Sequence, residues 1–228
     1  MKKKIIFIII LFHILFLIYP LRISFTNKGQ LVFNYDKDSK LTLEESIYIL
    51  VNKKISLKRN YKPNDLTLID KKCRGKEQYL KKQAAVNFNN LCFDMLNLNM
   101  NLKATSAFRT YTKQESLFNQ YVKEEGYETA IMGSAFPGHS EHQTGLAVDI
   151  TFNDYKHTQI DTTSTYIWFK HNIHKYGFII RYPEGKENIT GYMYEPWHLR
   201  YVGINVATYI YENDITYDEY YEKFIKVS

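Results

Sequence analysis

The segment 138–150, GHSEHQTGLAVDI, restricts the fold of this 228-residue chain more than any other stretch. Its second half alternates apolar residues on one face with small or acidic residues on the other, which predicts a β-strand with one buried face. Asp149 lies on the second face, and Gly145 lets the backbone turn tightly before the strand begins. We therefore expect Asp149 on a rigid strand, close to His142 on the preceding turn.

These two side chains supply two of the three protein ligands that a catalytic zinc ion needs. The pair alone is not specific, because histidine and aspartate also occur as hydrogen-bonded capping residues. The best candidate for a third ligand is His198 in the segment EPWH, where Glu195 is close enough in sequence to reach a water bound to the metal. Residues i and i+3 of a regular strand point to opposite faces, so this hypothesis requires a turn or bulge at Pro196. The alternative is a buried Trp197 flanked by a capping glutamate and a core histidine.

Arg109 lies between a predicted strand and a predicted helix in SAFRTYTKQ, where site residues are often found. Its guanidinium is suited to bind a substrate carboxylate or to stabilise an oxyanion, and its alternative role is a structural salt bridge. His171 and His174, one helical turn apart, form a second candidate metal pair. Without a third ligand nearby we expect this pair to be structural, and we expect His139 only to line the first site.

The formal net charge of +6 does not indicate a nucleic-acid partner. Four of the basic residues, Lys2, Lys3, Lys4 and Arg22, lie at the N-terminus, and the rest of the chain has 26 basic against 24 acidic residues. That remainder shows no basic stripe interleaved with aromatic residues, so the electrostatic signature of a nucleic-acid-binding protein is missing.

Residues 1–23 have the pattern of an export signal, with three lysines followed by an apolar run over 5–19. The run is short for a membrane-spanning helix, but no A-x-A-like cleavage site follows it, so we favour an uncleaved signal anchor over a cleaved signal peptide. Either form leaves the lysines inside and exports the rest of the chain to the outer face of the cell membrane or to the cell wall. Residues 24–40 are polar and predict an irregular linker, and 41–228 form the main domain.

The only two cysteines, Cys73 and Cys92, have 18 residues between them. In an oxidising compartment they are suited to form one disulfide. The alternative is that Cys92 fills the apolar face of a helix as a small hydrophobic residue. Neither lies near a histidine in the sequence, which argues against a zinc–thiolate site.

Apolar periodicity and capping signals predict an α+β domain with a mainly antiparallel sheet, flanking helices and the zinc site on the sheet. Helices and strands alternate without a regular βαβ order. Pairs of threonine and glutamate three residues apart predict helix starts at Thr42, Thr112 and Thr216. The predicted helices cover 42–51, 79–98, 112–126, 163–176, 206–212 and a segment after 216, and the predicted strands cover 102–107, 146–151, 178–182 and 192–198.

Four segments, SAFRTYTKQ, PGHSEHQTGLAVD, YGFIIRYP and EPWHLRYVG, resemble in this order the signature segments of VanY-type D-alanyl-D-alanine carboxypeptidases. These enzymes belong to the lysostaphin, D-Ala-D-Ala peptidase and hedgehog group of zinc metallopeptidases. The resemblance covers roughly 50–212, and the pattern S-x-H-x-x-G-x-A-x-D followed by E-x-x-H is highly specific. Only the cysteines and the helix after Asn213 depart from the family pattern.

The resemblance implies a role for each matching residue. One Zn²⁺ would be bound by His142, Asp149 and His198. Glu195 would be the general base, and Arg109 would stabilise the transition state or hold the substrate. Ser140 and Gln114 match family positions that line the site.

The activity implied is removal of a C-terminal D-alanine from peptidoglycan stem peptides, by attack of a metal-bound water that Glu195 activates. Two alternatives remain open. The first is an L,D-carboxypeptidase or an endopeptidase acting on the same stem peptides. The second is a non-catalytic, zinc-containing module that binds the cell wall. The sequence leaves the oligomeric state open.

Overall fold

A four-stranded antiparallel sheet forms the centre of the computed structural model, which describes residues 22–25, 31–34, 46–153 and 155–226. Its strand order is β5–β6–β8–β7. The strands are β5 (Leu102–Ser106), β6 (Ala147–Phe152), β8 (His198–Tyr201) and β7 (Phe178–Ile180). Two antiparallel pairs lie outside this sheet, β1 (Arg22–Phe25) with β2 (Leu31–Asn34) and β3 (Leu66–Leu68) with β4 (Tyr79–Lys81). The α+β class with a mainly antiparallel sheet is therefore confirmed.

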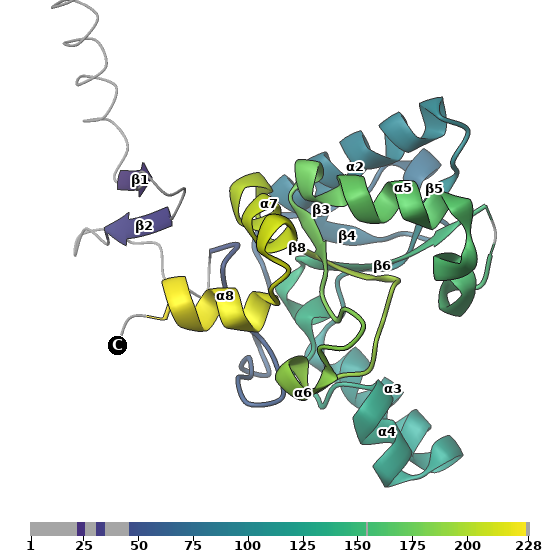
Figure 1. Cartoon of the computed structure of the whole chain (residues 1–228). Helices are drawn as coiled ribbons and strands as arrows, with labels where there is room; N and C mark the ends of the chain where they lie inside the picture. The colour runs from purple at the N-terminus through teal and green to yellow at the C-terminus, as the bar shows by residue number, and fades with distance from the viewer. Residues whose placement is uncertain (1–21, 26–30, 35–45, 154, 227–228) are drawn as a thin grey trace, which may run out of the picture.

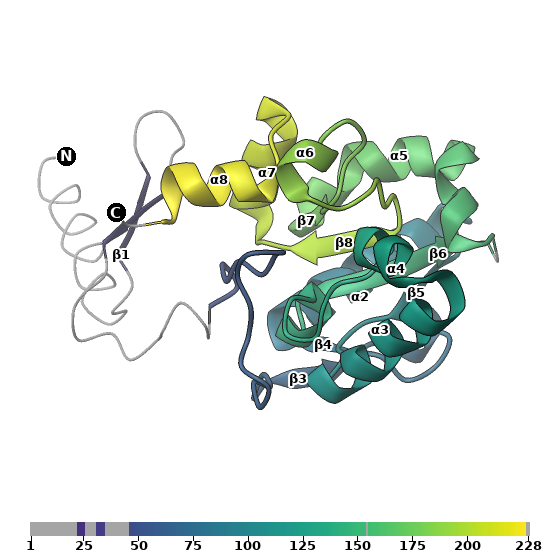
Figure 2. The ribbon, with the colours of Figure 1, turned by 90° about the horizontal axis from the view of Figure 1, so that it is seen from below.

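Helices flank the sheet on both sides (Figures 1 and 2). One face is covered by α2 (Lys82–Asn97) and α5 (Ser164–Asn172), while α3 (Tyr111–Glu125) and α4 (Tyr127–Gly133) lie beyond the opposite face. The chain ends in α7 (Ile204–Asn213) and α8 (Tyr217–Phe224). Short helical segments connect these elements: η2 (Lys71–Cys73), η3 (Glu141–Thr144), η4 (His157–Thr162), η5 (Ile173–Tyr176) and α6 (Glu187–Thr190).

The alternation along β6 and β8 separates a core face from a site face. Val148 and Ile150 are fully buried in the main core with Leu199 of β8, against Phe88 of α2 and Phe169 of α5. The residues between them point to the other face of the sheet, because successive side chains of a strand alternate. The strand predicted over 146–151 is thus confirmed, together with its buried face.

A second, smaller core holds the C-terminal helices against the edge of the sheet. It is built from Leu50, Ile179 of β7, Val206 of α7 and the tyrosines of α8. The capping box predicted at Thr216 is present: its side chain accepts from the backbone N–H of Glu219, whose carboxylate accepts from the backbone N–H of Thr216. Helix α8 is therefore a firmly packed part of the domain.

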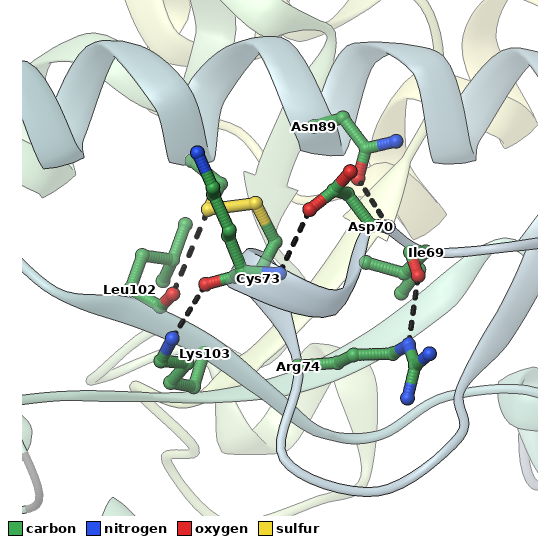
Figure 3. The surroundings of a disulfide bond; sticks show 9 residues. Ile69, Asp70, Cys73, Arg74, Asn89, Leu102 and Lys103 are labelled. Carbon is green, nitrogen blue, oxygen red and sulfur yellow. Dashed lines mark hydrogen bonds between the residues drawn. A yellow bond between two sulfur atoms is a disulfide. The ribbon is translucent and has the colours of Figure 1, made fainter.

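A disulfide joins Cys73 of η2 to Cys92 of α2, with the Cα atoms 5.9 Å apart (Figure 3). Asp70 opens η2 by accepting a hydrogen bond from the backbone N–H of Lys72. The pairing left open by the sequence is thus settled, and both sulfur atoms are excluded from metal binding.

The predicted and observed elements differ in several places. The helix expected over 79–98 begins only at Lys82, because Tyr79–Lys81 form strand β4. Described residues 46–51 form a turn and extended chain instead of a helix, because the guanidinium of Arg200 takes the carbonyl oxygens of Ile47 and Ile49 as acceptors. Helix α3 is capped by Thr110, whose side chain accepts from the N–H of Lys113, so the start predicted at Thr112 is wrong by two residues.

The strand predicted over 192–198 begins only at His198. The backbone N–H of His198 donates to the carbonyl of Glu195 at 3.2 Å, which closes a turn at Pro196 and Trp197. Strand β3 lies in a stretch for which no helix or strand was predicted. Strands β1 and β2 lie in the stretch 24–40 expected to be an irregular linker, with β1 starting at Arg22.

Of the predicted signal segment 1–23, residues 1–21 lie outside the described part of the chain. Among the residues that the structure does describe, no helix combines the length and the apolar character needed to cross a membrane.

Candidate active site

The register of the central sheet brings two of the proposed ligands together. Asp149 of β6 and His198 of β8 are direct cross-strand partners, so both point to the site face of the sheet. His198 Nδ1 lies 3.0 Å from Asp149 Oδ1. The turn at Pro196 is what places His198 first in its strand.

His142 reaches the same point from η3. Gly145 ends this segment with φ +69°, and a Cβ there would come within 3.0 Å of Leu66 Cδ2, so both the conformation and the packing require glycine. His142 Nε2 lies 3.2 Å from Asp149 Oδ2. Its Nδ1 is 2.7 Å from the carbonyl oxygen of Ala107, which can only accept, so the proton is on Nδ1 and Nε2 is free to bind a metal.

The three residues form a set that fits a zinc ion. One ligand atom from each of His142, Asp149 and His198 lies within 4.8 Å of the others, the one such group among the described residues. Two imidazole nitrogens and one carboxylate oxygen are ligands that zinc prefers, and three protein ligands leave a fourth position open for water or substrate. The sequence-predicted ligands are therefore brought together in a geometry suited to one ion.

Burial and charge act differently on the two histidines. Burial lowers the pKa of His142, and the opposing attraction of Asp149 does not offset it. Burial also disfavours protonation of His198, but the nearby carboxylates of Asp149 and Glu141 raise its pKa to about 9. Burial acts to raise the pKa of Asp149, but His142 and His198 hold it well below its ordinary value, so Asp149 is an anionic ligand.

Glu195 lies beside the ligands on the turn before β8. Its backbone N–H donates to the carbonyl of Tyr182 at 3.0 Å, and its Oε2 lies 3.7 Å from His198 Nδ1. Burial raises the pKa of Glu195 to about 7, against the lowering effect of His198. A carboxylate with a pKa near neutrality is suited both to accept and to release a proton.

Arg109 connects the ligands with helix α3. Its backbone N–H donates to the carbonyl of His142, and its guanidinium donates to Gln114 Oε1 at 2.8 Å and Ser106 Oγ at 3.2 Å. Nη2 also lies 3.8 Å from Asp149 Oδ2. Gln114 in turn donates to the carbonyl of Ala135 at 2.7 Å, so it fastens α3 to the segment after α4. The guanidinium is thereby held with one edge toward the ligands.

All these side chains line one cleft of about 680 Å³. The sheet side presents the ligands, Glu195, Arg109 and Ser140, and the helical side presents residues of α3 and α4, among them Gln114. A cleft of this size with a few convergent polar groups is typical of a small-ligand site. His139 is not among the lining residues, contrary to expectation, because its Nδ1 is bonded to the carbonyl of Asn52.

The second histidine pair is placed as expected. His171 Nδ1 is bonded to the hydroxyl of Tyr211, and the ring of His174 stacks on that tyrosine with centroids 4.1 Å apart. Within the described residues no third ligand joins them, so the pair ties η5 and α5 to α7.

Sequence reasoning missed three charged residues under the site, Glu141, Arg181 and Arg200. Their side chains are fully buried, and both arginines donate to Glu141 Oε1 at 2.7 Å. The only signal was an arginine within each of the apolar strand patterns YGFIIRYP and HLRY, which pointed to Arg181 and Arg200 but not to Glu141 as their partner.

Comparison with known proteins agrees with this geometry. Residues 77–204 match the family described as VanY, D-alanyl-D-alanine carboxypeptidase. The chain belongs to this family. The putative carboxypeptidase YodJ of Bacillus subtilis (strain 168) is 42% identical over 190 residues, which cover 80% of this chain and 70% of that protein. The bifunctional D-Ala-D-Ala dipeptidase and carboxypeptidase VanXYC of Enterococcus gallinarum is 33% identical over 76% of this chain and 92% of its own.

Two solved structures bear on the activity and the metal. The LD-carboxypeptidase LdcB superposes with a TM-score of 0.75 at 38% identity, covering 91% of this chain and 96% of its own. A mutant of the vancomycin-resistance D,D-pentapeptidase VanY, in complex with Zn(II), superposes with a TM-score of 0.63 at 32% identity, covering 76% of this chain and 97% of its own. The protein is thus a carboxypeptidase of the VanY type, and a zinc-bound relative shares its fold.

Proposed function

We propose that the protein is a zinc-dependent carboxypeptidase that removes the C-terminal D-alanine from peptidoglycan stem peptides. One observation carries this proposal: His142, Asp149 and His198 present ligand atoms within 4.8 Å of one another, in a cleft that Glu195 and Arg109 also line. The set combines a metal site, a candidate base and a candidate oxyanion donor, which together suit hydrolysis of a peptide bond.

The roles of the chain's own residues follow from their positions. A bound zinc ion supplies Lewis acidity and lowers the pKa of its water to about 7. Glu195 takes the proton of the attacking water and later delivers it to the departing amine of D-alanine. Arg109 donates to the oxygen that becomes negative as the carbonyl carbon turns tetrahedral. Gln114 and Ser106 hold the guanidinium in place for this role.

Two specificities share this chemistry. A D,D-carboxypeptidase removes the last residue of a pentapeptide stem, and an L,D-carboxypeptidase removes the last residue of a tetrapeptide stem. The similarity to LdcB, which extends over 91% of the chain, favours the L,D-carboxypeptidase activity. The D,D-pentapeptidase VanY and VanXYC favour the first.

The substrate implies a location. Peptidoglycan lies outside the cytoplasmic membrane, and the lysine-flanked apolar segment 1–23 has the pattern of an export signal. We therefore place the domain at the outer face of the cell membrane, or in the cell wall if the segment is cleaved. Stem peptides are its partners, and the proposal involves no nucleic acid.

The test is mass spectrometry of defined muropeptides, pentapeptide and tetrapeptide in parallel, treated with the zinc-loaded full-length chain. Loss of one D-alanine from the pentapeptide indicates a D,D-enzyme, and loss only from the tetrapeptide indicates an L,D-enzyme. Glu195→Ala is the control and should leave both peptides intact. If the folded, zinc-loaded wild type releases no D-alanine from either, the proposal fails in favour of an endopeptidase or a wall-binding module.

A further inference from the structure

A buried cluster of charges lies directly beneath His198. Glu141 is 1% exposed, and its Oε1 accepts from Arg181 Nε and Arg200 Nη1, each at 2.7 Å. Arg181 Nη1 donates to Asp218 Oδ2 of α8 at 2.6 Å. Two carboxylates therefore face two guanidiniums, and the cluster is neutral. Burying four charges is costly unless they are paired and hydrogen-bonded with good geometry.

One oxygen of Glu141 is not used by the arginines. Glu141 Oε2 and His198 Nε2 are both buried without a hydrogen-bond partner in the described part of the chain, and they lie 3.7 Å from each other. The other nitrogen of the ring, Nδ1, faces Asp149 and Glu195. A small rotation of the imidazole would bring Nε2 to hydrogen-bond distance of Oε2 without turning Nδ1 away from the site.

We propose that Glu141 positions His198 as a metal ligand by accepting the Nε2 proton, and that Asp218 on α8 supports Glu141 through Arg181. Ligating histidines commonly donate their second N–H to a carboxylate or carbonyl, which fixes the tautomer and the orientation of the ring. The carbonyl of Ala107 serves His142 in this way. Glu141 accepts the corresponding N–H of His198. Its full negative charge makes the other ring nitrogen of His198, which faces the site, more basic.

The charge balance explains why α8 takes part. Two arginines share one oxygen of Glu141, so one buried positive charge would be uncompensated without Asp218. That excess charge would draw the carboxylate away from His198 and would repel a cation at the site. Asp218 also accepts from Asn52 Nδ2 at 2.9 Å, which fixes the carboxylate from its other side. Helix α8 lies beyond residues 77–204, the part of the chain that matches the family.

The inference rests on the zinc site of the proposed function, but its test needs no substrate. Zinc affinity is measured by chelator competition on the full-length chain and its variants, together with the visible absorption spectrum of the Co(II)-loaded proteins. For Glu141→Gln we expect zinc to bind about 10–100-fold more weakly and the Co(II) bands to shift. For Asp218→Asn we expect a loss of several-fold in the same direction.

Two control variants separate positioning from general loss of stability. Asp65→Asn also converts an ion-paired carboxylate to an amide, but its partner is Lys81 and no ligand histidine. Thr216→Ala removes the cap of α8 and leaves Asp218 unchanged. Both should keep the wild-type zinc affinity and Co(II) spectrum. If Glu141→Gln does not fold, Glu141→Asp retains the charge but withdraws the carboxylate, and the same weakening is expected.

Wild-type zinc affinity and Co(II) bands in a folded Glu141 variant would overturn the role of Glu141. Equal weakening by Thr216→Ala and Asp218→Asn would overturn the role of the Asp218 carboxylate, since docking of α8 would then account for the effect. A wild type that cleaves no stem peptide but binds zinc in a Glu141-dependent way would refute the proposed function and support this inference.

Discussion

The two walls of the cleft are built in opposite ways. The wall formed by η3, β6 and β8 holds its polar residues buried or half-buried, and hydrogen bonds or ion pairs fix the candidate ligands to neighbouring residues. The wall formed by α3 and α4 instead carries or adjoins exposed apolar side chains such as Tyr127, Met132 and Phe136. Arg109, between β5 and α3, joins the two walls: its backbone N–H donates to the carbonyl of His142 and its guanidinium donates to Gln114.

This difference assigns separate tasks to the walls. Catalytic groups must keep their geometry to within a fraction of an ångström, which a sheet with direct cross-strand partners provides. A wall that contacts variable parts of a substrate instead needs a large contact area and some mobility. We therefore expect changes in the sheet wall to affect the chemical step, and changes in the helical wall to affect mainly substrate binding.

Removal of the metal should give the largest effect on activity. The accompanying loss of structural protection should be confined to the sheet wall. Chelation is expected to abolish D-alanine release, and added zinc should restore it. Zinc at about 100 times its dissociation constant should stabilise the fold by about 2.7 kcal/mol. Hydrogen exchange should show weaker protection of 141–149 and 195–201 in the apo protein, with α3 and α4 little changed. Equal loss of protection in both walls would contradict the assignment of metal binding to the sheet wall alone.

Glu195→Gln should lower kcat by a factor of about 10²–10⁴, because an amide cannot take a proton from water. The side chain keeps its shape, so zinc content and the melting temperature should stay near wild type. The matched change on the other wall is Leu117→Ala, which we expect to alter KM more than kcat. A Glu195→Gln enzyme that kept more than a tenth of the wild-type kcat would rule out the proposed role of this carboxylate.

Arg109→Lys should lower kcat by about 10²-fold, because lysine cannot reproduce the planar fork that bonds Gln114 and Ser106 while facing the ligands. Gln114→Ala should have a smaller effect of the same kind, since it frees the guanidinium but leaves its charge. Steady-state kinetics on the preferred stem peptide would measure both. A change in KM alone for Arg109→Lys would make it a substrate-binding residue instead of an oxyanion donor.

Strand β6 and the convergence of the three candidate ligands could be predicted because much of the information is local. The alternation in 146–150 sets the face of Asp149, and the proline in EPWH provides the turn that brings Glu195 and His198 together. Long-range contacts could not be predicted in the same way. Of the helix expected over 42–51, the described residues 46–51 form a turn and extended chain instead, because Arg200 bonds two of their carbonyls from about 150 positions away. Glu141 and its arginines are 40 and 59 residues apart, and no local pattern joins them.

The same limit applied to the disulfide, whose cysteines the sequence could count but not pair. Cys73 and Cys92 join η2 to α2, the helix on the face of the sheet opposite the site (Figures 1 and 3). The bond should therefore contribute to stability and almost nothing to catalysis. Closing a loop of this length stabilises a fold by about 3 kcal/mol, chiefly by restricting the unfolded chain.

The double variant Cys73→Ala with Cys92→Ala should lose about that amount of unfolding free energy in urea, while kcat and KM change less than about twofold. Wild-type protein kept in reductant should match the double variant in stability, which separates the bond from the packing of the sulfur atoms. A clear fall in kcat would mean that α2 and the core beneath β6 transmit strain to Asp149. The sheet wall would then depend on the far face of the sheet, and its rigidity could not be ascribed to the cross-strand contacts alone.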